Sequence, residues 1–245
     1  MKRIIIIGAT SGIGRSVSLK FVSAGWKVGI AARREEELKK LASEAPSQIF
    51  YEIIDVTSDN ASESLSSLIN KVGGMDIFFL SSGVGFQNPQ LESEIEIKTI
   101  RTNVMGFTMM IDGAYKYFKE HGGNGQIAAI SSIAGTKGLG VAASYSATKR
   151  YQNTYLDAID QLAHLENLDL KVTDIRPGFV KTNLLNDGHS YPMLLDAEKV
   201  GGIIFKVLIN RKRVKIIDWR YAILVFFWRL IPQCIWSRLK IKTSK

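Results

Sequence analysis

The chain has 245 residues, 46% of them hydrophobic, which is typical of one globular domain with at most an appendage. A chain of this length can bury a substantial core, which excludes a disordered or fibrous protein. The net charge of +9 is unevenly placed, because residues 206–245 hold eleven basic residues and one acid, leaving 21 basic and 22 acidic residues for positions 1–205. The body is therefore nearly neutral, and we expect no nucleic-acid partner for it.

Cysteine and histidine are scarce in this sequence. The single cysteine, Cys234, excludes an internal disulfide framework and a multi-cysteine zinc site. His121 and His164 have no acidic or cysteine partner at ligand spacing, so we assign no metal. Basic residues precede the apolar residues 4–7, but this run is too short for a signal peptide and fits a buried strand. A reducing, cytoplasmic location is expected.

Short apolar runs alternate with longer segments of helical period, which is typical of β-α units around a parallel sheet. We expect strands over residues 3–7, 27–31, 49–54, 76–80, 126–131, 171–176 and 213–217. Helices are expected over residues 13–24, 34–44, 60–72, 94–119, 144–166 and 196–210. The expected fold class is α/β, a Rossmann-like doubly wound parallel sheet of about seven strands with helices on both faces and a C-terminal amphipathic helical tail.

The first expected strand runs into a glycine-rich turn, Gly8-Ala9-Thr10-Ser11-Gly12-Ile13-Gly14, which Arg15 and an amphipathic helix follow. Glycines permit positive φ and let backbone N–H groups approach a pyrophosphate at the start of a helix. The glycine spacing differs from the commoner dinucleotide fingerprint, and the turn lacks the Gly-Lys pair of a P-loop. The turn predicts dinucleotide binding by these residues, with a tight turn needed only for packing as the alternative.

The end of the second expected strand bears on the choice of cofactor. A site that prefers NAD usually has an acidic residue there, which binds the ribose 2′-hydroxyl. This sequence has Arg33 and Arg34 instead, and guanidinium groups bind phosphate bidentately. We therefore expect NADP(H) rather than NAD, with Arg15 as a further cation. In the alternative, both arginines open a solvated helix and pair with the acidic residues 35–37.

A tyrosine and a lysine stand four residues apart in Tyr145-Ser146-Ala147-Thr148-Lys149, at the start of an expected helix. Residues at this spacing share a helix face, so the Lys149 ammonium can lie beside the Tyr145 phenol and lower its pKa. Two polar residues precede them: Ser132, after an expected strand, and Asn103, inside an expected helix. Taken singly, the pair would be ordinary surface residues, and Asn103 would bond locally.

Together these motifs resemble the short-chain dehydrogenase/reductase family in its compact single-domain form, over about residues 3–205. The glycine turn of the family matches Gly8, Gly12 and Gly14, and its catalytic set matches Asn103, Ser132, Tyr145 and Lys149. Asp55-Val56 resembles the pair that meets the adenine, and Arg176-Pro177-Gly178-Phe179-Val180-Lys181-Thr182 resembles the segment that meets the nicotinamide. The joint order and spacing of these motifs make the resemblance specific.

The resemblance implies hydride transfer between the nicotinamide of NADP(H) and a carbonyl or secondary alcohol. Ser132 and Tyr145 would hold the substrate oxygen, and Tyr145 would donate the proton. Lys149 would bind the nicotinamide ribose and lower the Tyr145 pKa, while Asn103 would hold a water that relays protons toward Lys149. The chain departs from the family in having Leu80-Ser81-Ser82-Gly83 for Asn-Asn-Ala-Gly and Ile7 for threonine, which bears on stability and cofactor affinity.

The family builds its substrate lid before the last long helix, here at residues 183–195. This stretch is short and rather apolar, which favours a hydrophobic or lipid-like substrate over a sugar. We interpret His189 within it as a loop residue. The resemblance also implies a homo-oligomer, a dimer or tetramer formed through the helices at 94–119 and 144–166.

The segment after residue 218 is basic and aromatic. Residues 221–228 are apolar throughout, but Arg229 ends this run well short of the roughly 20 residues that span a bilayer. On one helix, Arg229, Gln233, Ser237 and Lys240 would form a polar stripe, although Pro232 is expected to start a second helix. Such a segment is typical of a helix in the membrane interface, attracted to anionic lipid. Packing on the body and contact between subunits remain as alternatives.

The sequence predicts an NADP-binding catalytic domain over residues 1–205, followed by the last strand and a basic, apolar tail over 206–245. We expect a cytoplasmic oxidoreductase, peripheral at the membrane surface, that acts on a small apolar carbonyl or alcohol. Two alternatives stay open. The chain could be a non-catalytic NADP-binding regulator or membrane-recruited scaffold, or an epimerase-type relative, which would normally need a larger C-terminal substrate domain.

Overall fold

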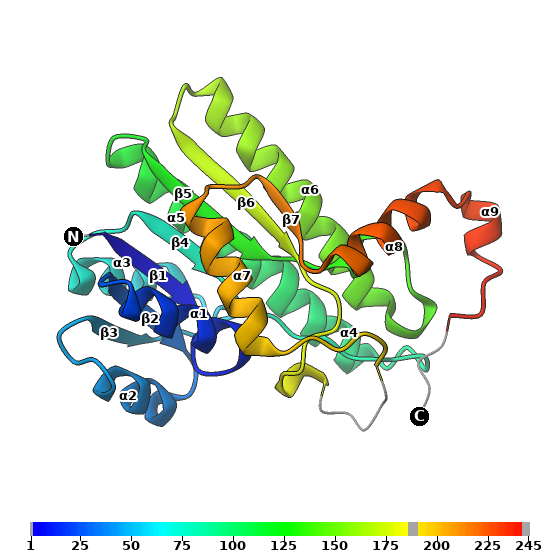
Figure 1. Ribbon diagram of the computed structural model, residues 1–245, viewed down its shortest axis with the longest axis horizontal. Coiled ribbons are helices and arrows are strands. Elements are labelled where there is room, and N and C mark those ends of the chain that lie inside the picture. The colour runs from blue at the N-terminus through cyan, green and yellow to red at the C-terminus, as the bar shows by residue number, and fades with distance from the viewer. Residues whose placement is uncertain (1, 186–190, 242–245) are drawn as a thin grey trace.

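Figure 1 shows a computed structural model of the protein, in which residues 2–185 and 191–241 are described. Residues 186–190, which include His189 and the middle of the expected substrate lid, lie outside the described residues. One parallel sheet has the strand order β3-β2-β1-β4-β5-β6-β7. Its strands are β1 (Arg3–Ile7), β2 (Lys27–Ala32), β3 (Ile49–Ile53), β4 (Ile77–Leu80), β5 (Gly125–Ile130), β6 (Leu170–Arg176) and β7 (Val214–Ile216). The expected doubly wound sheet is confirmed.

Helices cover both faces of this sheet (Figure 1). One face packs against α3 (Ala61–Val72), α5 (Phe107–Glu120) and α6 (Ala143–Leu165), and the other against α1 (Gly12–Ser23), α2 (Glu35–Ser43) and α7 (Ala197–Ile209). In β1, Ile5 and Ile7 join the first core, whereas Ile4 and Ile6 join the second. A strand buried on both faces needs apolar residues at every position, which explains the isoleucine run.

The segment expected as one helix at 94–119 is divided into three parts. It consists of α4 (Ser93–Ile100), a π-helical segment η1 (Arg101–Gly106) and α5. At Gly106 the backbone lies against β3–α3 loop atoms, because a Cβ there would be 2.6 Å from the Val56 carbonyl oxygen. The wider turn of η1 places Asn103 fully inside the protein. Single π-turns within helices often occur at functional sites.

The C-terminal tail forms α8 (Trp219–Leu230) and α9 (Gln233–Trp236), which project from the body beside β7 and α6 (Figure 1). The expected second helix at Pro232 is confirmed, because α8 ends at Leu230 and Pro232 is the N-cap of α9, so Arg229 and Gln233 do not share one helix. Tyr221 and Val225 are buried against the body. Within the described residues, no helix is both long and apolar enough to cross a membrane.

Candidate active site

The predicted catalytic residues meet at the carboxyl edge of the sheet. Ser132 lies two residues after the end of β5, and Tyr145 and Lys149 lie on the first turns of α6. Asn103 reaches the same place from η1. The glycine turn follows β1, which lies beside β4 at the point where the strand order reverses. Open α/β sheets bind ligands in the crevice at such a point.

Tyr145 and Lys149 lie one helical turn apart, with Lys149 Nζ 5.8 Å from the centre of the Tyr145 ring. Burial raises the pKa of the Tyr145 phenol, and a hydrogen bond with Ser132 opposes this rise. The net shift of the Tyr145 pKa is thus upward in the protein alone, and the lowering by Lys149 that the family resemblance implies stays a prediction. A phenol with a raised pKa keeps its proton at neutral pH and can donate it to a developing alkoxide.

Lys149 is itself buried and polar contacts hold its ammonium. Nζ donates to the Ile130 carbonyl at 3.1 Å and to Gln152 Oε1 at 2.9 Å. Burial lowers the Lys149 pKa to about 8, and the carboxylate of Asp174 opposes this shift. Most of the lysine is then protonated at neutral pH, so a positive charge stands beside the phenol.

Asn103 has structural partners for each of its polar atoms. Its Oδ1 accepts from Val84 N at 2.9 Å, and its Nδ2 donates to the Val84 carbonyl at 2.7 Å and to Thr148 Oγ1 at 3.2 Å. Its backbone carbonyl accepts from Gln152 Nε2 at 2.9 Å. The side chain thus fixes the loop after β4, and the backbone connects to Lys149 through Gln152.

A buried polar network lies behind Lys149. Asp174 on β6 is fully buried and accepts from Ser131, from Asn153 Nδ2 at 2.9 Å and from Arg176 Nε at 2.7 Å. The paired guanidinium and the two neutral donors offset the cost of burying this carboxylate. The network braces the ends of β5 and β6 against α6, from which Tyr145 and Lys149 project.

The three glycines of the turn between β1 and α1 stand where a side chain would collide with neighbouring atoms. Gly8 has φ of 86°, and a Cβ there would lie 2.6 Å from Ser82 N. A Cβ on Gly14 would lie 2.1 Å from the Gly8 carbonyl oxygen, and one on Gly12 would lie 2.8 Å from Thr182 Cγ2. The turn therefore keeps its backbone close to β4 and to the segment after β6, where an anion can meet the N-terminus of α1.

The remaining residues of the turn surround these glycines. Thr10, Ser11 and Ile13 are half-buried at the start of α1. Arg34 Nη2 donates to Thr10 Oγ1 at 3.0 Å, which connects the end of β2 to the turn. Arg15 forms an ion pair with Glu44 at 2.8 Å, so its charge is largely neutralised before any phosphate binds. This pairing weakens the expectation of Arg15 as a phosphate cation.

Arg33 and Arg34 are both exposed at the end of β2. Glu35 and Glu36, two of the acids that the alternative interpretation pairs with these arginines, form ion pairs with Lys39 at 3.1 and 3.2 Å. Within the part of the chain that the structure describes, neither guanidinium forms an ion pair within 4.0 Å, although the charge of Arg33 acts on Asp55, so both groups stand beside the turn where a phosphate could bind.

Asp55 and Val56 follow β3 on the same side of the sheet. Burial raises the Asp55 pKa, whereas hydrogen bonds from Thr57 and the charge of Arg33 lower it. Together the lowering effects are larger than the effect of burial, so the net shift is downward. Val56 is buried against Gly106. Asp55 is therefore an ionised acceptor at neutral pH, at the place where the resemblance puts the adenine.

The segment after β6 is held in place by the C-terminal tail. Tyr221 Oη lies 3.0 Å from the Pro192 carbonyl oxygen and 3.1 Å from the Met193 carbonyl oxygen, which share its single O–H donor, and it accepts from Phe179 N at 3.2 Å. A Cβ on Gly178 would lie 2.2 Å from the Tyr221 ring. The fully buried Tyr221 thus fixes both the expected nicotinamide segment, with its buried Pro177 and Val180, and the described end of the lid.

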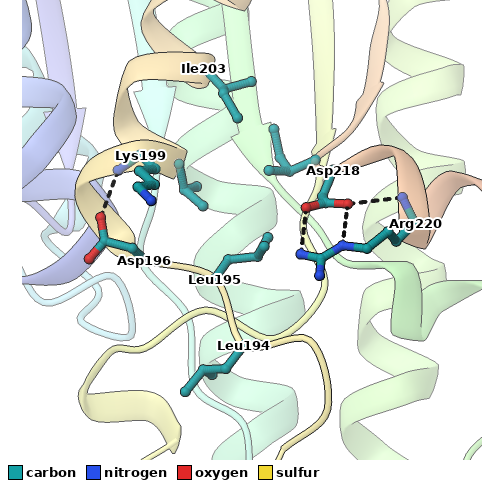
Figure 2. A pocket seen from close by; sticks show the side chains of 9 residues that line it. Leu194, Leu195, Asp196, Lys199, Ile203, Asp218 and Arg220 are labelled. Carbon is teal, nitrogen blue, oxygen red and sulfur yellow. Dashed lines mark hydrogen bonds and ion pairs between the residues drawn. The ribbon is translucent and has the colours of Figure 1, made fainter.

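A cavity of about 360 Å³ lies between the end of the lid, α7 and the start of α8 (Figure 2). Asp196 accepts from the backbone N of Lys199 at 2.9 Å, and Asp218 pairs with Arg220 at 2.8 Å. These charged groups are satisfied locally, while Leu194, Leu195 and Ile203 supply an apolar lining. The cavity is lined by neither Tyr145 nor Lys149, so it is separate from the catalytic residues.

Comparison with known proteins identifies the family to which this geometry belongs. The family model of the short chain dehydrogenases matches residues 2–190. The chain belongs to the short-chain dehydrogenase family. It is an oxidoreductase of this type, and the resemblance seen in the sequence is confirmed.

Three relatives illustrate how far the likeness extends. This short-chain dehydrogenase is 28% identical to an uncharacterized oxidoreductase of Myxococcus xanthus (strain DK1622), with 93% of this chain and 92% of the relative covered. It is 27% identical to a farnesol dehydrogenase of Aedes aegypti, over 86% of this chain and 91% of the relative. The solved structure titled ElxO with NADP bound has a TM-score of 0.79 at 23% identity and covers 90% of this chain and 98% of that chain, which shows a shared fold.

Sequence reasoning did not single out Gln152 or Tyr221. Gln152 lies seven residues after Tyr145 and three after Lys149, a spacing that puts all three on one helix face. A polar residue on the buried face of a helix was the available signal. Tyr221 gave no signal, because it stood in a run of apolar residues and its three backbone partners lie in two distant segments, the one after β6 and the lid.

Among the described residues, no group of three or more histidines, cysteines, aspartates or glutamates could hold a metal ion. Gly83 lies beside the catalytic residues, since a Cβ there would be 3.3 Å from Asn103 Oδ1 and 3.7 Å from Lys149 Nζ. Tyr145, Lys149 and Ser132 bring a phenol, an ammonium and a hydroxyl group to the site.

Proposed function

We propose that this short-chain dehydrogenase is an NADP(H)-dependent carbonyl reductase or alcohol dehydrogenase for apolar, lipid-like substrates. The observation that carries the proposal is the half-buried Tyr145 phenol, which is hydrogen-bonded with Ser132 and has the Lys149 ammonium 5.8 Å from its ring centre. A positioned phenol beside a cation is a general acid for a developing alkoxide. The bound nicotinamide would supply or accept the hydride.

In the reduction, the hydroxyl groups of Ser132 and Tyr145 donate hydrogen bonds to the substrate carbonyl oxygen. These bonds strengthen as negative charge develops on the oxygen, which stabilises the transition state. Tyr145 then transfers its proton to the oxygen, and the Lys149 ammonium stabilises the phenolate that remains. The reverse sequence oxidises an alcohol, with Tyr145 as the base.

The dinucleotide would be held by the glycine turn, by Asp55 and by the segment after β6. Gly8, Gly12 and Gly14 keep the turn open for a pyrophosphate at the start of α1, because a Cβ at any of them would meet neighbouring atoms at 2.8 Å or less. Asp55 would bind the adenine. The residues Pro177, Gly178, Val180 and Thr182 would line the nicotinamide side.

The preference for NADP(H) is proposed to come from Arg34 and Arg33. Arg34→Ala should weaken NADPH binding about tenfold and leave NADH binding nearly unchanged, because only NADPH carries the 2′-phosphate. Fluorescence titration with the two cofactors measures this difference. Lys40→Ala is the matched control, since it removes one exposed positive charge from α2, the helix that Arg34 precedes as N-cap. Equal losses for NADPH and NADH, or equal effects of both variants, would contradict the assignment.

The substrate class rests on the apolar character of the lid. Leu194 and Leu195 are the described lid residues that line the neighbouring cavity, and Phe179 packs on Tyr191 with ring centres 4.7 Å apart. The relative from Aedes aegypti is named a farnesol dehydrogenase, a name that refers to an apolar alcohol. A panel of carbonyls that increase in chain length, followed by NADPH absorbance, tests the proposal. Turnover with none of them would favour the alternative of a non-catalytic NADP-binding scaffold.

We further propose that α8 lies on an anionic membrane surface. Its outward residues are apolar and follow one helical stripe: Trp219, Ile223, Phe226, Phe227 and Leu230 are all exposed. Arg220, Arg229 and Arg238 are also exposed in this tail. Exposed aromatic side chains beside arginines are typical of helices in the membrane interface.

The membrane proposal predicts that Phe226→Ser with Phe227→Ser lowers vesicle binding about tenfold, since these side chains are 60% and 58% exposed and would enter the interface. Flotation with vesicles of phosphatidylcholine and phosphatidylserine measures the bound fraction. Leu165→Ser is the control, because Leu165 is 72% exposed on α6. Unchanged flotation of the double variant would support the alternatives of a subunit contact or an uncovered surface.

Exposed apolar side chains also support the proposal of a homo-oligomer. Ile97 and Ile100 on α4, Met105 on η1, and Leu162 on α6 are all exposed although large and apolar. These elements coincide with the two helical segments that the family resemblance assigns to subunit contacts. Pairing two copies through them would remove this surface from water.

A further inference from the structure

Gln152 is a fully buried polar residue that forms a bridge at the centre of the site. Its Nε2 donates to the Asn103 carbonyl at 2.9 Å, and its Oε1 accepts from Lys149 Nζ at 2.9 Å. The orientation of this carboxamide is fixed by chemistry. A carbonyl only accepts and an ammonium only donates, so the reversed amide would lose both hydrogen bonds.

The bridge determines where the Lys149 ammonium points. An ammonium has three N–H donors. Within the described residues, two of the donors go to the Ile130 carbonyl and to Gln152 Oε1. The third is left for the open side, where Gly83 lies against Nζ without a side chain. With two bonds fixed, the tetrahedral geometry fixes the direction of the third.

We propose that Gln152 is a positioning residue for the hydride-transfer reaction, which connects the Asn103 backbone to Lys149 and aims the ammonium at Tyr145 and the bound cofactor. The side chain occupies the link between Asn103 and Lys149 that the family resemblance assigns to a water. This inference rests on the proposed function. It goes further in giving a role to a residue outside the Asn, Ser, Tyr and Lys set.

The Gln152 oxygen also acts on the charge of Lys149, because an acceptor favours the protonated form. The other charged or titratable groups around Lys149 are Tyr145 on the same helix and Asp174 with its partner Arg176 on β6. From β5 and η1, the neutral groups Ser132 and Asn103 complete the surroundings. A substitution at position 152 should therefore change the pKa of Lys149.

Two variants at this position test the inference in opposite directions. Gln152→Met keeps the length of the side chain but removes the acceptor, so the Lys149 pKa should fall by about one unit. Gln152→Glu places a carboxylate on the ammonium, so the Lys149 pKa should rise. The measurement is a nitrogen NMR titration of lysine-labelled protein, with the Nζ signal assigned by its loss in Lys149→Met.

The control is Ile159→Val, a buried change on the same helix two turns further on, which should leave the Lys149 titration unchanged. A role in folding alone would lower stability in the position-152 variants and leave the Lys149 pKa in place. That result, or shifts of the same sign in Gln152→Met and Gln152→Glu, would overturn the proposal. The titration needs no substrate, so an absence of turnover in the wild-type protein would refute the proposed function without deciding this inference.

Discussion

Tyr145→Phe should lower the rate of carbonyl reduction by at least about 10²-fold, the usual contribution of a positioned general acid. The variant keeps the ring that packs against Gly85 but loses the hydroxyl that is hydrogen-bonded with Ser132. The glycine turn and the arginines at the end of β2 are untouched, so NADPH affinity should survive. Single-turnover NADPH oxidation measures the chemistry, and fluorescence titration measures the cofactor affinity.

Tyr151→Phe is the matched control for this prediction. Tyr151 lies on the same helix, and its hydroxyl is hydrogen-bonded with Thr108 at 2.7 Å on the other side of α6. The same chemical change at this position should leave turnover close to the wild-type rate. If both variants lost activity equally, the loss would reflect the helix and not the phenol.

Gly14→Ala should weaken NADPH binding about tenfold or more and lower the free energy of unfolding by about 1–3 kcal/mol. The new Cβ would lie 2.1 Å from the Gly8 carbonyl oxygen and 3.2 Å from Ala9 Cα. Both contacts are with backbone, so relief requires the whole turn to move away from the start of α1. Denaturant unfolding gives the stability, and fluorescence titration gives the affinity.

Gly202→Ala on α7 is the control for Gly14→Ala, because it adds the same methyl group at a position where no clash with the backbone results. A Cβ there would lie 3.5 Å from Lys20 Cε, an ordinary van der Waals contact. Alanine in a helix interior is favoured over glycine by roughly 0.5–1 kcal/mol, so this variant should be slightly more stable with unchanged NADPH affinity. Wild-type affinity in Gly14→Ala would show that the turn does not hold the cofactor.

The sheet could be predicted closely because its strands are buried on both faces. Residues 4–7 are isoleucines that belong alternately to the two cores, and an apolar run of this kind has no amphipathic helical period to mislead the assignment. The break at η1 could not be predicted, because a π-turn depends on the contact of Gly106 with Val56, which lies 50 residues away in the sequence. Local patterns carry no signal for such a contact.

The site was predictable where its geometry follows from helix period and strand ends. Tyr145, Lys149 and Ser132 meet because one pair shares a helix face and the serine lies just beyond the end of a strand. The charges were less predictable. The ion pair of Arg15 with Glu44 and the upward shift of the Tyr145 pKa both depend on which groups are buried together, which the sequence does not state.

The contacts of the C-terminal tail with the body could also not be predicted from the sequence. Its aromatic and basic composition predicted a surface helix, and α8 does expose Phe226 and Phe227. The inward side could not be foreseen, since Tyr221 finds its partners in Phe179 and the lid only after the chain has folded. A run that is apolar on all sides does not indicate which residues face the body.

The contact of Tyr221 with Gly178 and Phe179 makes α8 and the segment after β6 one cooperative unit. Local opening of α8 must break the hydrogen bond that the Tyr221 hydroxyl accepts from Phe179 N and the one it donates to the lid carbonyls, and it must release the backbone on which the nicotinamide would rest. A ligand that binds the closed segment therefore also stabilises α8 against opening. By reciprocity, any surface that draws α8 outward lowers the affinity for that ligand by the same factor.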